Sequence, residues 1–136
     1  MLMNRIFLVS LLLGLGWQLS AQKTNLINTA PEAWKENVTV VPLESSDDQS
    51  SYLIWVVDTV KPHYHADHTE CIYVLEGQGT FYLGDQVMEL QPGDFVMIPR
   101  GVIHSFKNKT STKSKVLSVQ TPKFDGKDRV WVEEQK

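Results

Sequence analysis

From residue 38 onward the chain is a succession of short runs rich in β-branched and aromatic residues, separated by turn residues. Such runs are typical of β-strands, and no helix-period segment long enough to cover a sheet interrupts them. Gly84-Asp85 predicts a two-residue hairpin turn, and Pro92-Gly93 predicts a type II turn. We therefore predict an all-β chain, a sandwich or closed barrel whose two sheets bury each other's inner faces. The predicted strands span residues 38–44, 51–60, 71–77, 79–84, 86–90, 94–99, 102–108, 115–121 and 129–133.

The size and charge of the chain limit its possible functions. Its 136 residues, 42% of them hydrophobic, leave room for one domain with one core. The formal net charge is -3, and Lys and Arg are scattered except in the segment 107–115, "KNKTSTKSK". We interpret this segment as a solvated loop between two strands. Nucleic acid is therefore not an expected partner.

The N-terminal 21 residues have the pattern of a signal peptide. Arg5 provides a basic start, an apolar run follows from residue 6 to 17, and the small residues Ser20 and Ala21 come next. The apolar run is shorter than the roughly 20 residues that span a bilayer. We predict cleavage after Ala21, export to the periplasm or the medium, and no membrane association of the mature chain.

Cys71 is the only cysteine, so an intrachain disulfide is impossible. It falls within a predicted strand. We interpret it as a small buried apolar side chain rather than as a reactive thiol.

Three of the four histidines lie within six residues, in the segment "HYHADH" that begins at His63. His63 and His65 are two positions apart, so on a strand they point to the same side, about 6.6 Å apart. A turn or bulge in the following "ADHT" would bring Glu70 to that side. Because Ile72 and Val74 share the face of Glu70, its carboxylate would enter an apolar interior, where an unpaired charge is costly. A divalent metal shared with the imidazoles would compensate that charge.

The fourth histidine belongs to a second segment, "IPRGVIHSFKN". Pro99 and Gly101 predict a sharp turn, after which a strand places His104 and Phe106 on one face. A third imidazole is thus expected among apolar neighbours. His68 lies in the predicted turn of the first segment, and we interpret it as a solvated loop histidine, with a proton-transfer role or a role behind the metal ligands as the alternative.

Together the two segments resemble the two conserved motifs of the cupin superfamily. In the first motif, four residues separate His63-x-His65 from Glu70, and six more separate Glu70 from Gly77. Fifteen residues then lie between Gly77 and Gly93, which begins the second motif. In that motif, five residues separate Gly93 from Pro99, one separates Pro99 from Gly101, two separate Gly101 from His104, and three separate His104 from Asn108. The short gap between the motifs is similar to that of small single-domain, type-2 members. The motif match covers residues 63–108, and the strand pattern extends it over residues 38–132.

The resemblance implies a single jelly-roll β-barrel over residues 38–132, preceded by a lead segment over residues 22–37 and followed by a tail over residues 133–136. It also implies one bound divalent transition metal, which is Fe, Mn, Ni, Zn or Cu. The implied ligands are His63, His65, Glu70 and His104. Small cupins commonly pair, and a sandwich has edge strands with unpaired backbone groups, so we expect a homodimer.

Cupins catalyse many reactions, so the resemblance leaves the function open. Four protein ligands leave up to two positions on an octahedral ion. The predicted pocket wall of Ile72, Val74 and Phe106 is apolar and fits a compact, partly hydrophobic small molecule. The leading hypothesis is a metal-dependent enzyme, with an oxygenase resembling quercetinase-type cupins as its main form.

Two other functions remain open from the sequence. A lyase or isomerase would use a tyrosine, a histidine or a carboxylate to move a proton, with Tyr64, Tyr73 and Tyr82 as tyrosine candidates. An exported sensor would bind a small molecule or a sugar without turnover. A purely structural metal is the remaining alternative.

Overall fold

The computed structural model describes residues 22–132, which form ten strands and no helix. The strands are β1 (Val38–Ser45), β2 (Ser50–Val56), β3 (Thr59–Tyr64), β4 (Thr69–Glu76), β5 (Gly79–Leu83), β6 (Gln86–Leu90), β7 (Phe95–Ile98), β8 (His104–Asn108), β9 (Ser114–Thr121) and β10 (Val130–Trp131). Within these residues no helix is long and apolar enough to cross a membrane. The predicted signal peptide and C-terminal tail lie outside the described residues.

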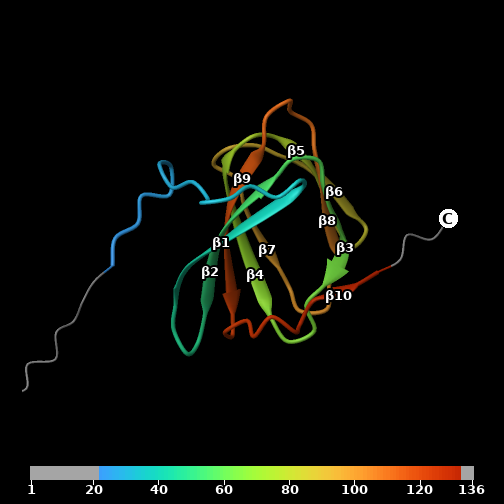
Figure 1. The fold of residues 1–136 in the computed structure, drawn as a ribbon. Helices are drawn as coiled ribbons and strands as arrows, with labels where there is room; N and C mark the ends of the chain where they lie inside the picture. Colours follow the sequence, from blue (N-terminus) through green and yellow to red (C-terminus); the bar gives the residue numbers. More distant parts are fainter. Residues whose placement is uncertain (1–21, 133–136) are drawn as a thin grey trace, which may run out of the picture.

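The strands form two antiparallel sheets of five strands each. One sheet has the order β1-β2-β9-β4-β7 and the other the order β10-β3-β8-β5-β6, and Figure 1 shows the two facing each other. Strands that are consecutive in the chain often lie in different sheets, as in a jelly roll. The predicted all-β jelly roll is confirmed, although the two sheets are not joined by hydrogen bonds into a closed barrel.

The predicted strand over residues 51–60 is wrong, because this run forms two strands, β2 and β3, in different sheets. The break is stabilised by Asn37, whose side-chain oxygen accepts hydrogen bonds from the backbone amides of Asp58 at 3.0 Å and Thr59 at 3.1 Å. The side-chain amide of Asn37 also donates to the carbonyl of Thr59 at 2.7 Å. Because Asn37 lies about twenty residues upstream, the sequence of the run itself does not indicate the break.

The predicted turns are confirmed. Gly84, with a φ of 55°, lies between β5 and β6, and Leu83 pairs with Gln86 across the hairpin. Gly93 and Gly101 also have positive φ, of 99° and 73°. Only glycine adopts such angles without steric cost, so these residues set where the chain reverses direction.

The inner faces of the two sheets meet in an apolar core. Its fully buried members are Val74, Phe81, Leu90, Val96 and Ile98. Burying a side chain of this size stabilises the fold by about 1.5–3 kcal/mol. These residues come from β4 to β7, and Val74, Phe81 and Leu90 among them also line a cavity between the two sheets.

The lead segment is tied to the first sheet. Lys115 of β9 is only 2% exposed and donates to the carbonyls of Ile27 and Thr29, at 3.0 Å each. Its ammonium also lies 5.1 Å from the ring centroid of Trp55. Residues 27–29 of the segment before β1 are therefore held against β9.

Cys71 is half-buried on β4, next to Glu70 but on the opposite face of the sheet. The expectation of a fully buried side chain is therefore wrong in degree. Burial and the nearby Glu70 carboxylate raise the pKa of the Cys71 thiol. The group is accordingly a protonated thiol at neutral pH, in keeping with an inert cysteine.

Candidate metal centre

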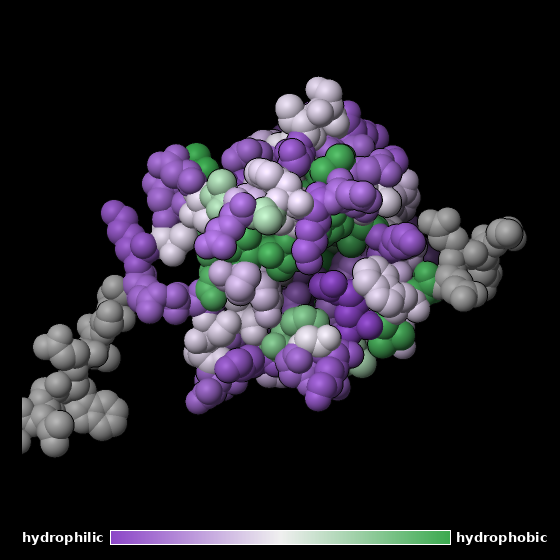
Figure 2. All heavy atoms as spheres, in the orientation of Figure 1, coloured by the Kyte–Doolittle hydropathy of each residue, from purple (hydrophilic) through white to green (hydrophobic). Residues whose placement is uncertain are grey.

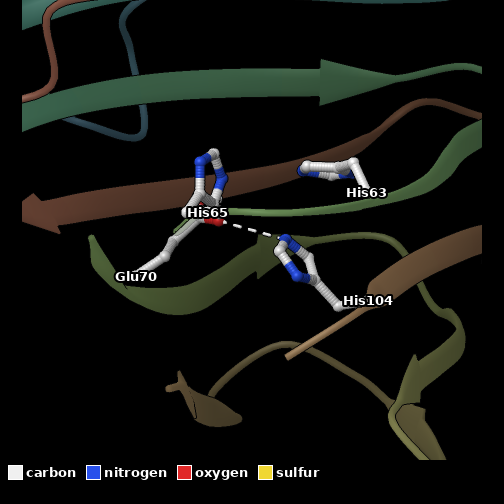
Figure 3. A group of neighbouring side chains, drawn as sticks. All are labelled: His63, His65, Glu70 and His104. Atoms are coloured by element: carbon white, nitrogen blue, oxygen red, sulfur yellow. Dashed lines mark ion pairs between the residues drawn. The ribbon is translucent and has the colours of Figure 1, made fainter. Parts of the chain in front are cut away.

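The structure brings together the four side chains that the sequence analysis singled out. His63 lies near the end of β3 and pairs with His104 at the start of β8, while Glu70 comes from β4 of the opposite sheet. Figure 3 shows the imidazoles of His63, His65 and His104 and the carboxylate of Glu70 gathered around a common point. One potential ligand atom from each of the four residues lies within 4.8 Å of the others, and all four side chains are buried.

Backbone carbonyls fix the tautomer of each histidine. The Nδ1–O distances are 2.8 Å from His63 to Lys61, 2.7 Å from His65 to Asp128 and 3.0 Å from His104 to Val102. A carbonyl oxygen can only accept, so each Nδ1 carries the proton and donates it. Each Nε2 of a neutral ring then presents a lone pair, which is the arrangement of a metal-ligating histidine.

The Nε2 atoms of His65 and His104 are buried and have no hydrogen-bond partner. Each lies 3.4 Å from Oε2 of Glu70. Two lone pairs facing a carboxylate oxygen in a buried site are unfavourable unless a cation lies among them. The donor set of three imidazole nitrogens and one carboxylate therefore fits a divalent first-row metal ion.

His63 is held in its neutral form. Burial lowers its pKa most, and repulsion from His104 adds to the effect, so that the pKa falls to about 4. At neutral pH the ring consequently keeps the lone pair that a metal ligand needs.

Glu70 is held in its ionised form. Burial alone would raise its pKa, but His104 and His65, which donate to the carboxylate when their rings are protonated in the absence of a metal, and the hydroxyl of Ser118 outweigh burial and lower the pKa below its ordinary value. Its Oε1 accepts hydrogen bonds from the hydroxyl of Ser118 and, at 3.3 Å, from the amide of Gln120. The two carboxylate oxygens thus have separate roles, because Oε1 is anchored to β9 and Oε2 faces the histidines.

The interpretation of His68 as a solvated loop residue is wrong. Its side chain is 5% exposed, Nδ1 contacts the carboxylate of Asp128, and Nε2 lies 3.0 Å from the carbonyl of Lys123. Burial opposes a charge on the ring, but these two hydrogen bonds outweigh it and raise the pKa of His68. The imidazolium form satisfies both partners, since each ring nitrogen then donates.

Asp128 is a residue that the sequence analysis missed. Its carboxylate accepts from the backbone amides of Ala66 at 2.9 Å and Asp67 at 2.8 Å and contacts His68, while its carbonyl orients His65. One residue of the C-terminal segment thereby holds the loop that carries two of the histidines. Its partners lie about sixty positions upstream, so no local pattern in "DGKDRV" points to this role.

A cavity of about 390 Å³ lies between the two sheets and reaches His63, Glu70 and His104. The predicted wall residues Ile72, Val74 and Phe106 all line it, although their contact with a substrate stays a prediction. Figure 2 shows hydrophobic side chains exposed in the middle of one face of the molecule, with hydrophilic side chains around them. The cavity therefore joins an apolar chamber to the candidate ligands.

The three candidate tyrosines do not line this cavity. Tyr73 and Tyr82 are 41% and 43% exposed, and Tyr64 on β3 is half-buried. Among the described residues that line the cavity, Glu70 is the one carboxylate. A proton-transfer role for Tyr64, Tyr73 or Tyr82 in the cavity thus has no support from their positions.

A jelly roll that buries three histidines and a glutamate at the end of an internal cavity is the architecture of a cupin. The family model described as "Cupin domain" matches residues 54–120, and the chain belongs to the cupin superfamily.

Individual proteins and solved structures are also similar to this chain. An uncharacterized protein of Aquifex aeolicus is 38% identical over 98 residues, which cover 72% of this chain and 80% of that protein. Quercetin 2,3-dioxygenase of Bacillus subtilis is 40% identical over 65 residues, which cover 48% of this chain but 19% of the dioxygenase. Among solved structures, Pac13, described as a nucleoside dehydratase, has a TM-score of 0.65 at 17% identity and covers 84% of this chain and 92% of its own. This last likeness shows the fold alone.

Proposed function

We propose that this chain is a metal-dependent enzyme of the dioxygenase type that acts on a small, partly apolar organic molecule. The observation that carries the proposal is the convergence of histidine nitrogens and the Oε2 atom of Glu70 at the end of an apolar cavity. The local similarity to quercetin 2,3-dioxygenase supports the reaction type.

The ligands of the metal would be His63, His65, Glu70 and His104. A bound divalent ion of iron, manganese, nickel, zinc or copper supplies Lewis-acid polarisation of a substrate oxygen. The carbonyls behind the three rings hold their Nε2 atoms in a fixed orientation, which limits reorganisation when a ligand binds. The apolar walls exclude water and hold the body of the substrate.

A lyase is the second candidate, because Pac13 shares the fold and is described as a nucleoside dehydratase. Elimination needs a side chain that moves a proton within reach of the substrate. Outside the four candidate ligands, the described residues that line the cavity offer neither a carboxylate nor a tyrosine for this task, and their two lysines, Lys35 and Lys61, are exposed. This composition favours the dioxygenase proposal over the lyase.

The test is oxygen uptake by protein purified without oxygen and loaded separately with each of the five metals. A panel of flavonols and other enols is supplied, and oxygen consumption is followed together with product formation. We expect at least one metal form to consume oxygen in step with substrate, and His104→Ala to lose this activity. Product formed without oxygen uptake would favour the lyase, and ligand that is retained and recovered unchanged would favour a binding or sensor protein.

A further inference from the structure

A cationic side chain lies beside the candidate ligands at the edge of the cavity. Arg129 and Trp131 line the cavity together with His63, and the rings of Trp131 and His63 are 5.2 Å apart between centroids. The guanidinium carbon of Arg129 lies 5.6 Å from the ring centroid of Trp131 and 5.9 Å from that of Phe124. Cation–π contacts with two rings hold the guanidinium at the cavity that the candidate ligands His63, Glu70 and His104 also line.

Arg129 has no anionic partner among residues 22–132. Its Nε is buried and makes no hydrogen bond to any described residue. The adjacent Asp128 does not serve as a partner, because its carboxylate is engaged by two backbone amides and by His68. A guanidinium is a rigid fork of N–H donors that matches a carboxylate in shape and charge.

The charged side chains that line the cavity also favour an anionic ligand. The lining includes three cationic side chains, the half-buried Arg129 and the exposed Lys35 and Lys61, and one carboxylate, that of Glu70. That carboxylate already faces His65 and His104 and accepts from Ser118, so it does not neutralise the cations. The remaining wall is largely apolar. Such a chamber suits a molecule with an anionic end and an apolar body.

We propose that Arg129 is a specificity-determining residue that binds the carboxylate of the substrate, so that the substrate class is a small organic acid with an apolar body. The carboxylate lies against the guanidinium, the adjoining part of the molecule faces His63, and the apolar body extends along Ile72 and Phe106. This inference rests on the proposed function and narrows its substrate class.

The test measures binding rather than turnover. Zinc-loaded protein, which has no redox chemistry, is titrated calorimetrically with benzoate, cinnamate, 3-phenylpropanoate and hexanoate and with the neutral amide of each. We expect at least one acid to bind about tenfold or more tightly than its amide, since a charge-assisted hydrogen bond is lost in the amide. Arg129→Met should reduce that ratio to about one, whereas Lys127→Met, which removes a cation from an exposed neighbouring position, should preserve it.

Arg129→Lys is the second variant, because it retains the charge and most of the stem. It should keep part of the preference for the acid, and it covers the case in which Arg129→Met does not fold. Zinc content is measured for each variant and should equal that of the wild type. The inference is overturned if no acid binds more tightly than its amide, or if the preference is undiminished in folded Arg129→Met or, where that variant does not fold, in Arg129→Lys. A preference for the acid without oxygen uptake would support the anion site and contradict the dioxygenase proposal. Oxygen uptake with neutral substrates only would support the dioxygenase proposal and contradict the anion site.

Discussion

Replacing Asp128 by Asn tests whether the C-terminal segment holds the histidine-bearing loop. The carboxylate serves three donors, which are the backbone amides of Ala66 and Asp67 and the ring of His68. Asn keeps one acceptor oxygen, loses the charge and turns an NH₂ group toward one of the donors. A hydrogen bond to a charged group contributes about 1.5–3 kcal/mol. With one bond lost and the others weakened, we expect the free energy of unfolding to fall by about 2–4 kcal/mol.

The effect should depend on pH in a defined direction. Burial alone would raise the pKa of Asp128, but hydrogen bonds from His68, Asp67 and Ala66 lower it, so its contribution is present above the unfolded pKa of Asp and is lost as pH falls through the folded value. The pKa of His68 is raised, so its contribution is complete below the unfolded pKa of His and is lost as pH rises through the folded value. The destabilisation should therefore be largest between about pH 4 and pH 6.5 and smaller in alkaline solution.

Urea denaturation of metal-free protein at about pH 5.5 and about pH 9 measures this difference. Asp125→Asn is the matched control, because the exposed Asp125 accepts a single hydrogen bond, at 2.9 Å from the amide of Lys127. The control should change stability by less than about 0.5 kcal/mol. Equal effects of the two substitutions, or an Asp128→Asn effect that does not shrink at alkaline pH, would refute the reasoning.

Three further predictions concern the fold, the N-terminus and assembly. Gly77 and Gly93 both have positive φ, but an added Cβ would lie 2.6 Å from the backbone of β9 only at Gly77. Gly77→Ala should therefore lower the midpoint of thermal unfolding more than Gly93→Ala does, and equal midpoints would contradict the contact. Exported protein should begin within a residue or two of Gln22 by N-terminal sequencing, and an uncleaved cytosolic chain would contradict export. Phe95 is 63% exposed on the outer face of the edge strand β7, which makes this strand a candidate dimer interface. Light scattering should show a dimer that Phe95→Glu weakens and that the control Gln86→Glu, on β6, does not weaken. A monomer at micromolar concentration would contradict this prediction.

The fold and the four candidate ligands were predictable because their signals are local. Alternation with a period of two placed Glu70 with Ile72 and Val74 on one face, and the turn glycines marked the strand ends. The cluster as a whole depends on only two short segments, each of which carries its own spacing. Such patterns can be recognised in a single sequence because the geometry of a strand fixes the direction of each side chain.

The contacts that support the site were not predictable, because they join distant segments. The segment around His68 is typical of a solvated turn, and the burial of His68 comes from the distant C-terminal segment that packs against it. Asp128 lies in a polar stretch whose sequence resembles an ordinary loop, Arg129 begins a predicted strand, and the roles of both come from their positions in the fold. The division between β2 and β3 likewise depends on Asn37, which lies outside the predicted strands.

The most direct test of the account is the metal content of single histidine variants. Wild-type protein, stripped and reloaded with cobalt, should bind one ion per chain by elemental analysis and show the visible absorption of cobalt with nitrogen and oxygen ligands. His63→Ala, His65→Ala and His104→Ala should each lose the ion, because three ligands at most remain. His68→Ala should still bind one ion per chain, because His68 supplies no ligand atom to the group. Loss of the ion in His68→Ala together with its retention in His104→Ala would contradict the proposed centre.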